Sequence, residues 1–365
     1  AQLAKLVVDI TTDTRQDSDC SGGKNPARVA LGRKGGRKRG IPAPRSFLRD
    51  GGNRLRSLRR RRVGVVANNI QRQIFAERAQ FPSTRTAAIR AVEKNLNGRT
   101  LVTFFTSFNH IVEIENDDCD MLQSVLQHID LKKGLALMID SPGGDGLAAE
   151  LIVNTCRAYS GTGDYWVIVP GSAKSAASII CMGASKILMA DSSQLGPVDP
   201  QIIRREGNNT WRQFSAYNLV SSYDKLFASA VSTKGNLEPY LQQLQAFDIR
   251  DINHYRDLIS LSEDIAIKIL KSGMMKGKTK AQIRKSIQLF LDPKMGTISH
   301  SRSINRAEAA DCGLTIEKLD VHSPRWQAIY ELYVRTQEFV NSRYASKCVE
   351  SSDECFTVPA PQSRA

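Results

Sequence analysis

Two short stretches indicate the fold class of this chain: DSPGGDG at residues 140–146 and PGSAKSAAS at residues 170–178. Each follows a strand-like apolar run, at residues 134–139 and 165–169, and each leads into a helix-like run. This alternation predicts parallel strands joined by right-handed crossovers. Both stretches would then lie at the carboxyl ends of neighbouring strands, where open α/β sheets build their sites.

The same patterns predict the other elements of an α/β body. Strands are expected at residues 101–108, 134–140, 165–169 and 186–190, and helices at 117–129, 147–159 and 174–183. Asn116 and Asp117 are suitable N-cap residues for the first of these helices. A charged helical pattern precedes the body at 70–97, and further helical patterns follow at 217–233, 251–275, 280–290 and 323–342. We therefore predict an α/β protein with a helical C-terminal half.

The charge of the chain is concentrated near its start. The net charge is +14, and residues 33–62 contribute +12 of it, with thirteen Lys and Arg against the single acid Asp50. Residues 1–65 lack sustained periodicity and are predicted to be a disordered basic tail. This tail is either simply solvated or contacts nucleic acid through phosphates, although it has few aromatic residues to stack on bases. Residues 66–345 are expected to form the folded domain. Residues 346–365, which are Ser/Pro-rich from residue 351, are expected to form a flexible C-terminal tail.

Cysteine usage and hydropathy favour a cytoplasmic protein. The seven cysteines form no C-x-x-C pair, which favours reduced structural thiols, with a Cys348–Cys355 pair as the alternative. The apolar run at 167–190 contains Pro170, Gly171 and Lys174, so it is interpreted as strand, turn, helix and strand rather than a membrane span. No signal peptide is evident. The sequence has no metal-ligand spacing, P-loop or dinucleotide fingerprint, so we expect neither a metal nor a cofactor.

Ser175 is the candidate nucleophile. It stands among alanines at a strand-to-helix turn, and a helix N-terminus favours developing negative charge. The N–H groups of Ala176 and Gly144 are expected to form an oxyanion hole, and Gly143 to let a peptide substrate approach the backbone closely. The alternative is that the serines of residues 172–178 form a polar stripe on a small-residue helix.

The two stretches, together with LGPVDPQ at residues 195–201, resemble the Clp-type serine peptidase superfamily and most closely its serine dehydrogenase proteinase family. The likeness runs from about residue 73 to residue 339. It implies the ClpP/crotonase fold with a parallel β/α spiral core, hydrolysis of protein or peptide substrates, and assembly into homo-oligomers. It also implies Ser175 as nucleophile and the backbones of Gly144 and Ala176 as oxyanion hole. The word "dehydrogenase" refers to a proposed substrate, so the resemblance implies no nicotinamide site.

The general base is not contained in these stretches. The Clp subunit has a His about 25 residues after its Ser, where this chain has Pro200, so a Ser-His-Asp triad is not supported. Relatives similar to signal peptide peptidase use a Lys about 40–50 residues after the Ser, and Lys225 falls at that spacing. The resemblance thus favours a Ser-Lys dyad, which requires a lowered lysine pKa. The alternative is a solvated Lys225 paired with Asp224.

Asp199 and His300 are further candidates. Asp199 stands between Pro197 and Pro200 and is expected either to line the substrate cleft or to orient a turn. His300 is assigned either a structural or substrate-contacting role or a catalytic one. The leading hypothesis is a serine peptidase. The alternatives are an inactive Clp-like scaffold that binds peptides or partners, and a crotonase-type acyl-CoA enzyme, whose fold also offers two N–H groups to an oxyanion.

Overall fold

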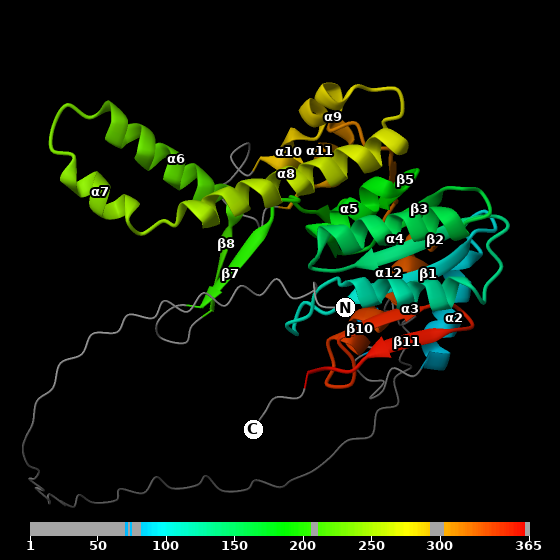
Figure 1. The fold of residues 1–365 in the computed structure, drawn as a ribbon. Helices are drawn as coiled ribbons and strands as arrows, with labels where there is room; N and C mark the ends of the chain where they lie inside the picture. The colour runs from blue at the N-terminus through cyan, green and yellow to red at the C-terminus, as the bar shows by residue number, and fades with distance from the viewer. Residues whose placement is uncertain (1–69, 72–73, 75–81, 206–210, 293–302, 362–365) are drawn as a thin grey trace, which may run out of the picture. The chain divides into compact units, whose positions relative to one another are not determined.

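The computed structural model describes residues 70–71, 74, 82–205, 211–292 and 303–361 (Figure 1). The predictions for the basic tail at residues 1–65, for Cys20 and for His300 lie outside the described residues.

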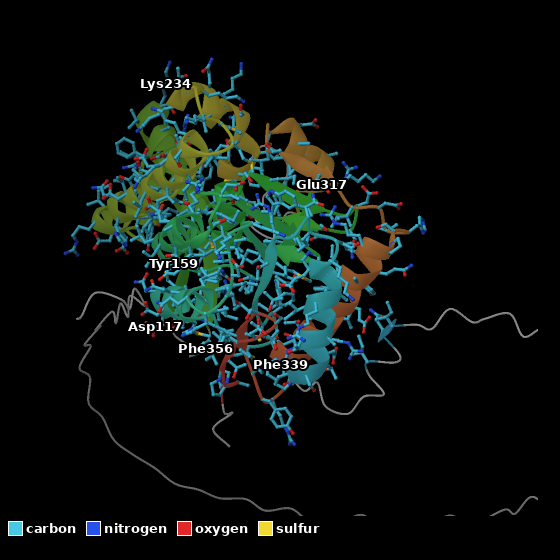
Figure 2. The ribbon with its side chains drawn as sticks, turned by 90° about the vertical axis from the view of Figure 1, so that its right-hand side faces the viewer. Asp117, Tyr159, Lys234, Glu317, Phe339 and Phe356 are labelled. Atoms are coloured by element: carbon cyan, nitrogen blue, oxygen red, sulfur yellow. The ribbon has the colours of Figure 1, made fainter. Side chains whose placement is uncertain are left out.

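A seven-stranded sheet forms the centre of the fold, in the order β11-β10-β1-β2-β3-β5-β9. Five neighbouring strands run parallel: β1 (Thr100–Thr106), β2 (Leu135–Asp140), β3 (Tyr165–Val169), β5 (Lys186–Met189) and β9 (Ile316–Lys318). β10 (Lys347–Glu350) and β11 (Cys355–Val358) add an antiparallel pair. Figure 2 labels Glu317 on one edge strand and Phe356 on the other. The predicted α/β class with a mostly parallel sheet is confirmed.

A second, shorter ladder follows the carboxyl ends of the main strands. Its pairs are Ile114 with Gly144, Ser141 with Ala173, β4 (Ser172–Ala173) with β6 (Gln194–Leu195), and Leu195 with Ile304. Four successive turns of chain thus each give one strand to the main sheet and a short extended segment to this ladder, and three of those segments lead directly into a helix. This repetition is the parallel β/α spiral that the resemblance implied.

Helices cover both faces of the main sheet. α3 (Asn116–Leu126), α4 (Gly146–Tyr159), α5 (Ala176–Gly183) and α8 (Ile249–Ser272) enclose one core, and α2 (Pro82–Glu93) and α12 (Pro324–Val340) the other. Val102 and Phe104 enter the first core, whereas Leu101 and Phe105 enter the second, as alternation along a strand buried on both faces requires. α3 begins one residue earlier than predicted, because Glu115 is its N-cap in a capping box with Asp118.

The chain beyond β6 is helical in large part, as predicted, but begins with a hairpin of β7 (Gln201–Arg205) and β8 (Trp211–Ser215). The hairpin leads to α6 (Ala216–Ser232) and α7 (Glu238–Leu244), and α6 packs on the first half of α8 through Ala216, Val220, Ile252 and Tyr255 (Figure 1). The predicted helix at 280–290 is two helices, α9 (Lys280–Ser286) and α10 (Gln288–Leu291), and α11 (Arg306–Asp311) follows. Among the helices that the structure describes, none combines the length and apolar character needed to cross a bilayer.

The prediction of a flexible C-terminal tail at 346–365 is wrong for most of this segment. β10 is buried along its whole length and pairs with β1, and β11 pairs with β10. Lys347 forms a buried ion pair with Asp118 at 2.9 Å. Composition alone misled the prediction, because a Ser-rich turn between two short strands has the same residue content as a solvated tail.

Candidate active site

Ser175 has a backbone conformation that only glycine adopts easily. Its φ is +49° and its ψ −121°, and it is the N-cap of α5. Such a conformation costs a non-glycine residue about 1–3 kcal/mol and persists only where surrounding contacts enforce it. Here Lys174 N donates to Ser141 O at 3.0 Å, and Ser178 Oγ donates to Ala173 O at 2.7 Å. The turn that presents Ser175 is therefore held on both sides.

The glycines at 143 and 144 pack against this turn and against Ile114 without room for a side chain. A Cβ on Gly143, whose φ is +108°, would lie 2.6 Å from both Lys174 O and Ser175 Cβ. A Cβ on Gly144, whose φ is +154°, would lie 2.2 Å from Ile114 N and 2.4 Å from Ile114 O. Both positions require glycine for space and for conformation.

Two N–H groups at this junction have no hydrogen-bond acceptor among the described residues, those of Gly144 and Ala176. The bridge between Ile114 and Gly144 is made by the residues on either side of Gly144. Ile114 N donates to Gly143 O at 2.8 Å, and Asp145 N donates to Ile114 O at 2.9 Å. Ala176 is the first residue of α5, where an N–H has no partner within the helix. Free N–H groups on two adjoining turns are what an oxyanion hole requires.

Ser175 Oγ has no hydrogen-bond partner within the described part of the chain, and the base remains a prediction. Lys225 is exposed on α6 and makes no hydrogen bond to Ser175 there. The alternative pairing with Asp224 is also absent, because Asp224 binds Arg256 at 2.6 Å. Lys225 instead borders a hollow of about 760 Å³ between α6 and α8, and Ser175 is not among the residues that line it.

The side chain of Lys174, beside the nucleophile, is held by hydrogen bonds to β6 and to Ser303. Its Nζ donates to Leu195 O at 3.1 Å, to Ser303 Oγ at 3.2 Å and to Gln194 Oε1 at 3.3 Å. Burial lowers the pKa of Lys174. These contacts connect the Ser175 turn to the β6 segment, so Lys174 has a structural role in this arrangement.

Asp199 is buried, with an exposed fraction of 3%, and its Oδ2 accepts from Gln201 Nε2 at 2.9 Å. Val198 N donates to Phe290 O at 2.9 Å, which fixes the segment around Asp199 to α10. These contacts agree with the expectation that Asp199 orients a turn. Contact with substrate stays a prediction.

Asp140 is a buried residue beneath the site that the sequence did not single out. Its Oδ1 accepts from Ser172 N at 2.7 Å, and its Oδ2 accepts from Gln337 Nε2 of α12 at 3.4 Å. A Cβ on Gly171 would lie 2.6 Å from Asp140 Oδ1 and 2.5 Å from the Tyr333 hydroxyl oxygen, so this cluster is close-packed. Burial raises the pKa of Asp140 to about 7. Its position directly before the Ser-Pro-Gly-Gly stretch was the one available signal, since Gln337 is distant in sequence.

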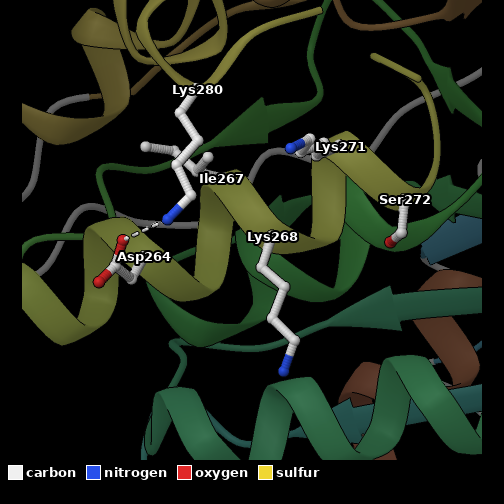
Figure 3. A pocket seen from close by; sticks show the side chains of 6 residues that line it. All are labelled: Asp264, Ile267, Lys268, Lys271, Ser272 and Lys280. Atoms are coloured by element: carbon white, nitrogen blue, oxygen red, sulfur yellow. Dashed lines mark ion pairs between the residues drawn. The ribbon is translucent and has the colours of Figure 1, made fainter. Parts of the chain in front are cut away.

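A second hollow, of about 330 Å³, lies along α8 (Figure 3), and Ser175 is not among the residues that line it. It is lined by Asp264, Ile267, Lys268, Lys271, Ser272 and Lys280. Lys268 pairs with Glu150 at 2.6 Å and Lys280 with Asp264 at 3.8 Å, so two of its three cations already have acidic partners. The hydroxyl of Ser272 donates to Ile269 O at 2.9 Å.

Residues 78–221 match the family model described as ClpP-like SDH-type serine proteinase. This part of the chain belongs to that family. The match covers the glycine stretch, Ser175 and the start of α6, but ends before Lys225. The predicted family is thus confirmed, and the spiral fold agrees with it.

Two uncharacterized proteins of Methanocaldococcus jannaschii are similar to short parts of the chain. One is 35% identical over 86 residues, which cover 24% of this chain and 29% of the relative. The other is 39% identical over 87 residues, which cover 24% of this chain and 26% of the relative. The chain therefore spans less than a third of the length of either relative.

Proposed function

We propose that this protein is a serine peptidase in which Ser175 attacks the carbonyl of a peptide bond. The observation that carries the proposal is the enforced positive φ of Ser175 at the start of α5, against the glycine backbone of residues 143–144. Strain held in place by neighbouring contacts is characteristic of functional residues. Membership of the proteinase family over residues 78–221 supports the same reaction class.

In the proposed mechanism the N–H groups of Gly144 and Ala176 stabilise the oxyanion that forms when Ser175 Oγ adds to the carbonyl. Each donor in such a site is worth about 3–4 kcal/mol of transition-state stabilisation. Gly143, which has no side chain, leaves the backbone open to the substrate, and Asp199 lines or orients the wall of the cleft. The general base takes the hydroxyl proton and returns it to the leaving amine.

Lys225 is retained as the proposed base. Its support is the Ser-Lys spacing of signal peptide peptidase-like relatives, which this chain reproduces. Because Lys225 is exposed here, the proposal requires α6 to bring it to Ser175 in the active state, where burial lowers its pKa.

The test is hydrolysis of unfolded casein and fluorogenic peptides by wild type and Ser175→Ala. Wild type is expected to hydrolyse at least one of them and Ser175→Ala none, while both show the same circular dichroism and thermal midpoint. Hydrolysis at the parent rate by Ser175→Ala removes Ser175 from the mechanism.

The second candidate function is a Clp-like scaffold that binds peptides without cleaving them. It is favoured by one observation, the Ser175 hydroxyl without a base at hydrogen-bonding distance in the described residues. Peptide binding by wild type without turnover, and without labelling by a fluorophosphonate, would establish it over the peptidase.

We also propose homo-oligomers in the cytoplasm. The support for assembly is apolar exposure on α6 and α7, where Phe227, Val231 and Leu241 are 51%, 72% and 43% exposed. The support for a reducing compartment is that the six described cysteines are all free thiols. Light scattering with Val231→Glu tests the first, since a contact through this face would be weakened by the charge.

A further inference from the structure

The last hairpin of the main sheet brings two cysteines, a carboxylate and an arginine together. Glu350 of β10 is directly opposite Cys355 of β11, and Cys348 is two residues before Glu350, so the three side chains share one face. Their Sγ and carboxylate atoms all lie within 4.8 Å of one another. Figure 2 marks this strand by Phe356, the residue after Cys355.

Arg85 of α2 is the cation in contact with this group. Its Nε donates to Glu350 Oε2 at 2.7 Å, and its Nη2 donates to Cys355 Sγ at 3.8 Å. Arg85 is fully buried beneath the ring of Phe339, so its charge is poorly screened by water. A guanidinium at this distance favours the thiolate form of Cys355.

The two thiols differ in access and in acidity. Cys355 is exposed, whereas Cys348 is fully buried. The hydrogen bond between them lowers the pKa of Cys355 and raises that of Cys348, and burial raises the Cys348 pKa further. An accessible, acidic thiol beside a buried, protonated one is the arrangement of an attacking and a resolving cysteine.

We propose that Cys355 and Cys348 form a peroxide-sensitive thiol pair that closes to a disulfide. The Cys355 thiolate attacks one oxygen of hydrogen peroxide, the O–O bond breaks, and the leaving hydroxide takes a proton to become water. Cys355 is then a sulfenic acid. The Cys348 thiol gives its proton to Glu350 and attacks the Cys355 sulfur. Glu350 passes this proton to the departing sulfenic hydroxyl, which leaves as a second water.

Glu350 is suited to the second step. Its Oε1 is buried and has no hydrogen-bond partner among the residues that the structure describes, so it is available to the sulfenic hydroxyl. Its Oε2 already accepts from Cys348 Sγ at 3.7 Å. Burial raises the pKa of Glu350, which makes it a stronger base than an exposed carboxylate.

Formation of the disulfide requires a local movement of the hairpin. A disulfide requires an S–S distance of about 2.05 Å, so the strands must approach each other from the present separation. β11 is the edge strand of the sheet and pairs only with β10 within the described residues, so no second strand opposes its movement. The four other described cysteines, at 119, 156, 181 and 312, are buried, and burial raises the pKa of Cys119, Cys156 and Cys181, so they are unsuited to attack peroxide.

The test uses the full chain with Cys20→Ser, because Cys20 lies outside the described residues. After treatment with hydrogen peroxide, intact mass is expected to fall by about 2 Da, and peptide mapping to show a Cys348–Cys355 crosslink. Dimedone is expected to label Cys355 in Cys348→Ser, at least about tenfold faster than any cysteine in Cys355→Ser. Cys312→Ser is the matched control and should leave the crosslink unchanged.

Two results would overturn the proposal. One is a peroxide product in which Cys348 and Cys355 stay reduced while another cysteine is oxidised. Because this mapping uses the chain with both cysteines intact, it does not depend on whether a variant folds. The other is retention of equimolar zinc after purification without chelator, lost in Cys355→Ser, which would make the cluster a metal site instead.

Discussion

The turns around Ser175 are enclosed by backbone contacts, whereas α6 and α7 are exposed along most of their length. Positive φ values occur at Gly143, Gly144 and Ser175. A Cβ added to either glycine would lie 2.2–2.6 Å from a neighbouring atom, and hydrogen bonds hold the Ser175 turn. α7 buries no residue, and α6 buries only Ala216, Val220 and Ala230. The proposed nucleophile and oxyanion hole thus lie on close-packed turns that follow the strands of the main sheet. The proposed base belongs to a helix whose position is set by one small cluster with α8.

This difference explains why the turns of the proposed nucleophile and oxyanion donors adjoin, whereas the proposed base has no contact with Ser175 among the described residues. Groups fixed by a close-packed sheet are preorganised for catalysis. A lysine on a lightly packed helix needs a further contact, from substrate or another subunit, to acquire a buried environment. The following variants separate these two parts of the proposed apparatus.

The largest effect is expected at Lys225. If α6 delivers the base, Lys225→Ala should lower kcat by about 10²–10⁴-fold, because general-base catalysis contributes that much. Lys234→Ala is the matched control, an exposed lysine just beyond α6, and should hydrolyse peptides at the wild-type rate. Equal rates for all three proteins would show that the helical region does not supply the base.

Gly144→Ala tests the proposed oxyanion hole. The new Cβ would collide with Ile114 N at 2.2 Å, so the turn must move, and peptidase activity should fall by about 10²–10³-fold through loss of an oxyanion donor. Gly163→Ala is the control, because Gly163 has a positive φ of +68° but no atom within 4 Å of the added Cβ. If both variants lose the same activity, strain alone accounts for the loss and the oxyanion hole is not supported.

Asp140 is expected to make the free energy of unfolding depend on pH. Its folded pKa of about 7 is above the value of about 4 for an unfolded aspartate. The folded protein therefore binds this proton more tightly than the unfolded chain does. The resulting contribution to the free energy of unfolding is fully present below about pH 4 and falls by about 2–4 kcal/mol as the pH rises through 7. Asp140→Asn should flatten the unfolding free energy between pH 5 and 8, measured in urea. Asp145→Asn, at an exposed N-cap, should leave the profile unchanged.

The smallest expected effect is a gain in stability. Ser175→Gly removes the cost of a positive φ and should raise the free energy of unfolding by about 1 kcal/mol, while Ser175→Ala keeps the strain and should not. Urea unfolding midpoints of the three proteins check this. A destabilised Ser175→Gly would mean that the serine side chain contributes packing that outweighs the strain.

Local patterns were sufficient to predict most of the α/β body. Apolar runs gave β1, β2, β3 and β5 to within two residues at each end, because strands buried on both faces are continuously apolar. The Ser-Pro-Gly-Gly stretch and the Ser175 turn were found to adjoin, since both follow neighbouring parallel strands. The closeness of Gly143 to Ser175 follows from that topology.

Contacts between distant parts of the chain were not predictable. Asp140 meets Gln337 across 197 positions, and Lys347 meets Asp118 across 229, so neither pairing has a local signature. β10 and β11 were missed because each is only four residues long. β10 is stabilised by pairing with β1, and β11 by pairing with β10. The backbone strain at Ser175 was also invisible, because an Ala-rich neighbourhood is compatible with an ordinary helix start.

The central claim is that the enforced Ser175 turn makes this hydroxyl a nucleophile. The most direct measurement is labelling of the wild-type chain with a fluorophosphonate, followed by mass spectrometry of the modified peptide. The account predicts one phosphonylated residue, Ser175, with no labelling of Ser172 or Ser178 and none at all in Ser175→Ala. A label on any other serine, or no label under conditions where the chain hydrolyses peptides, would contradict it.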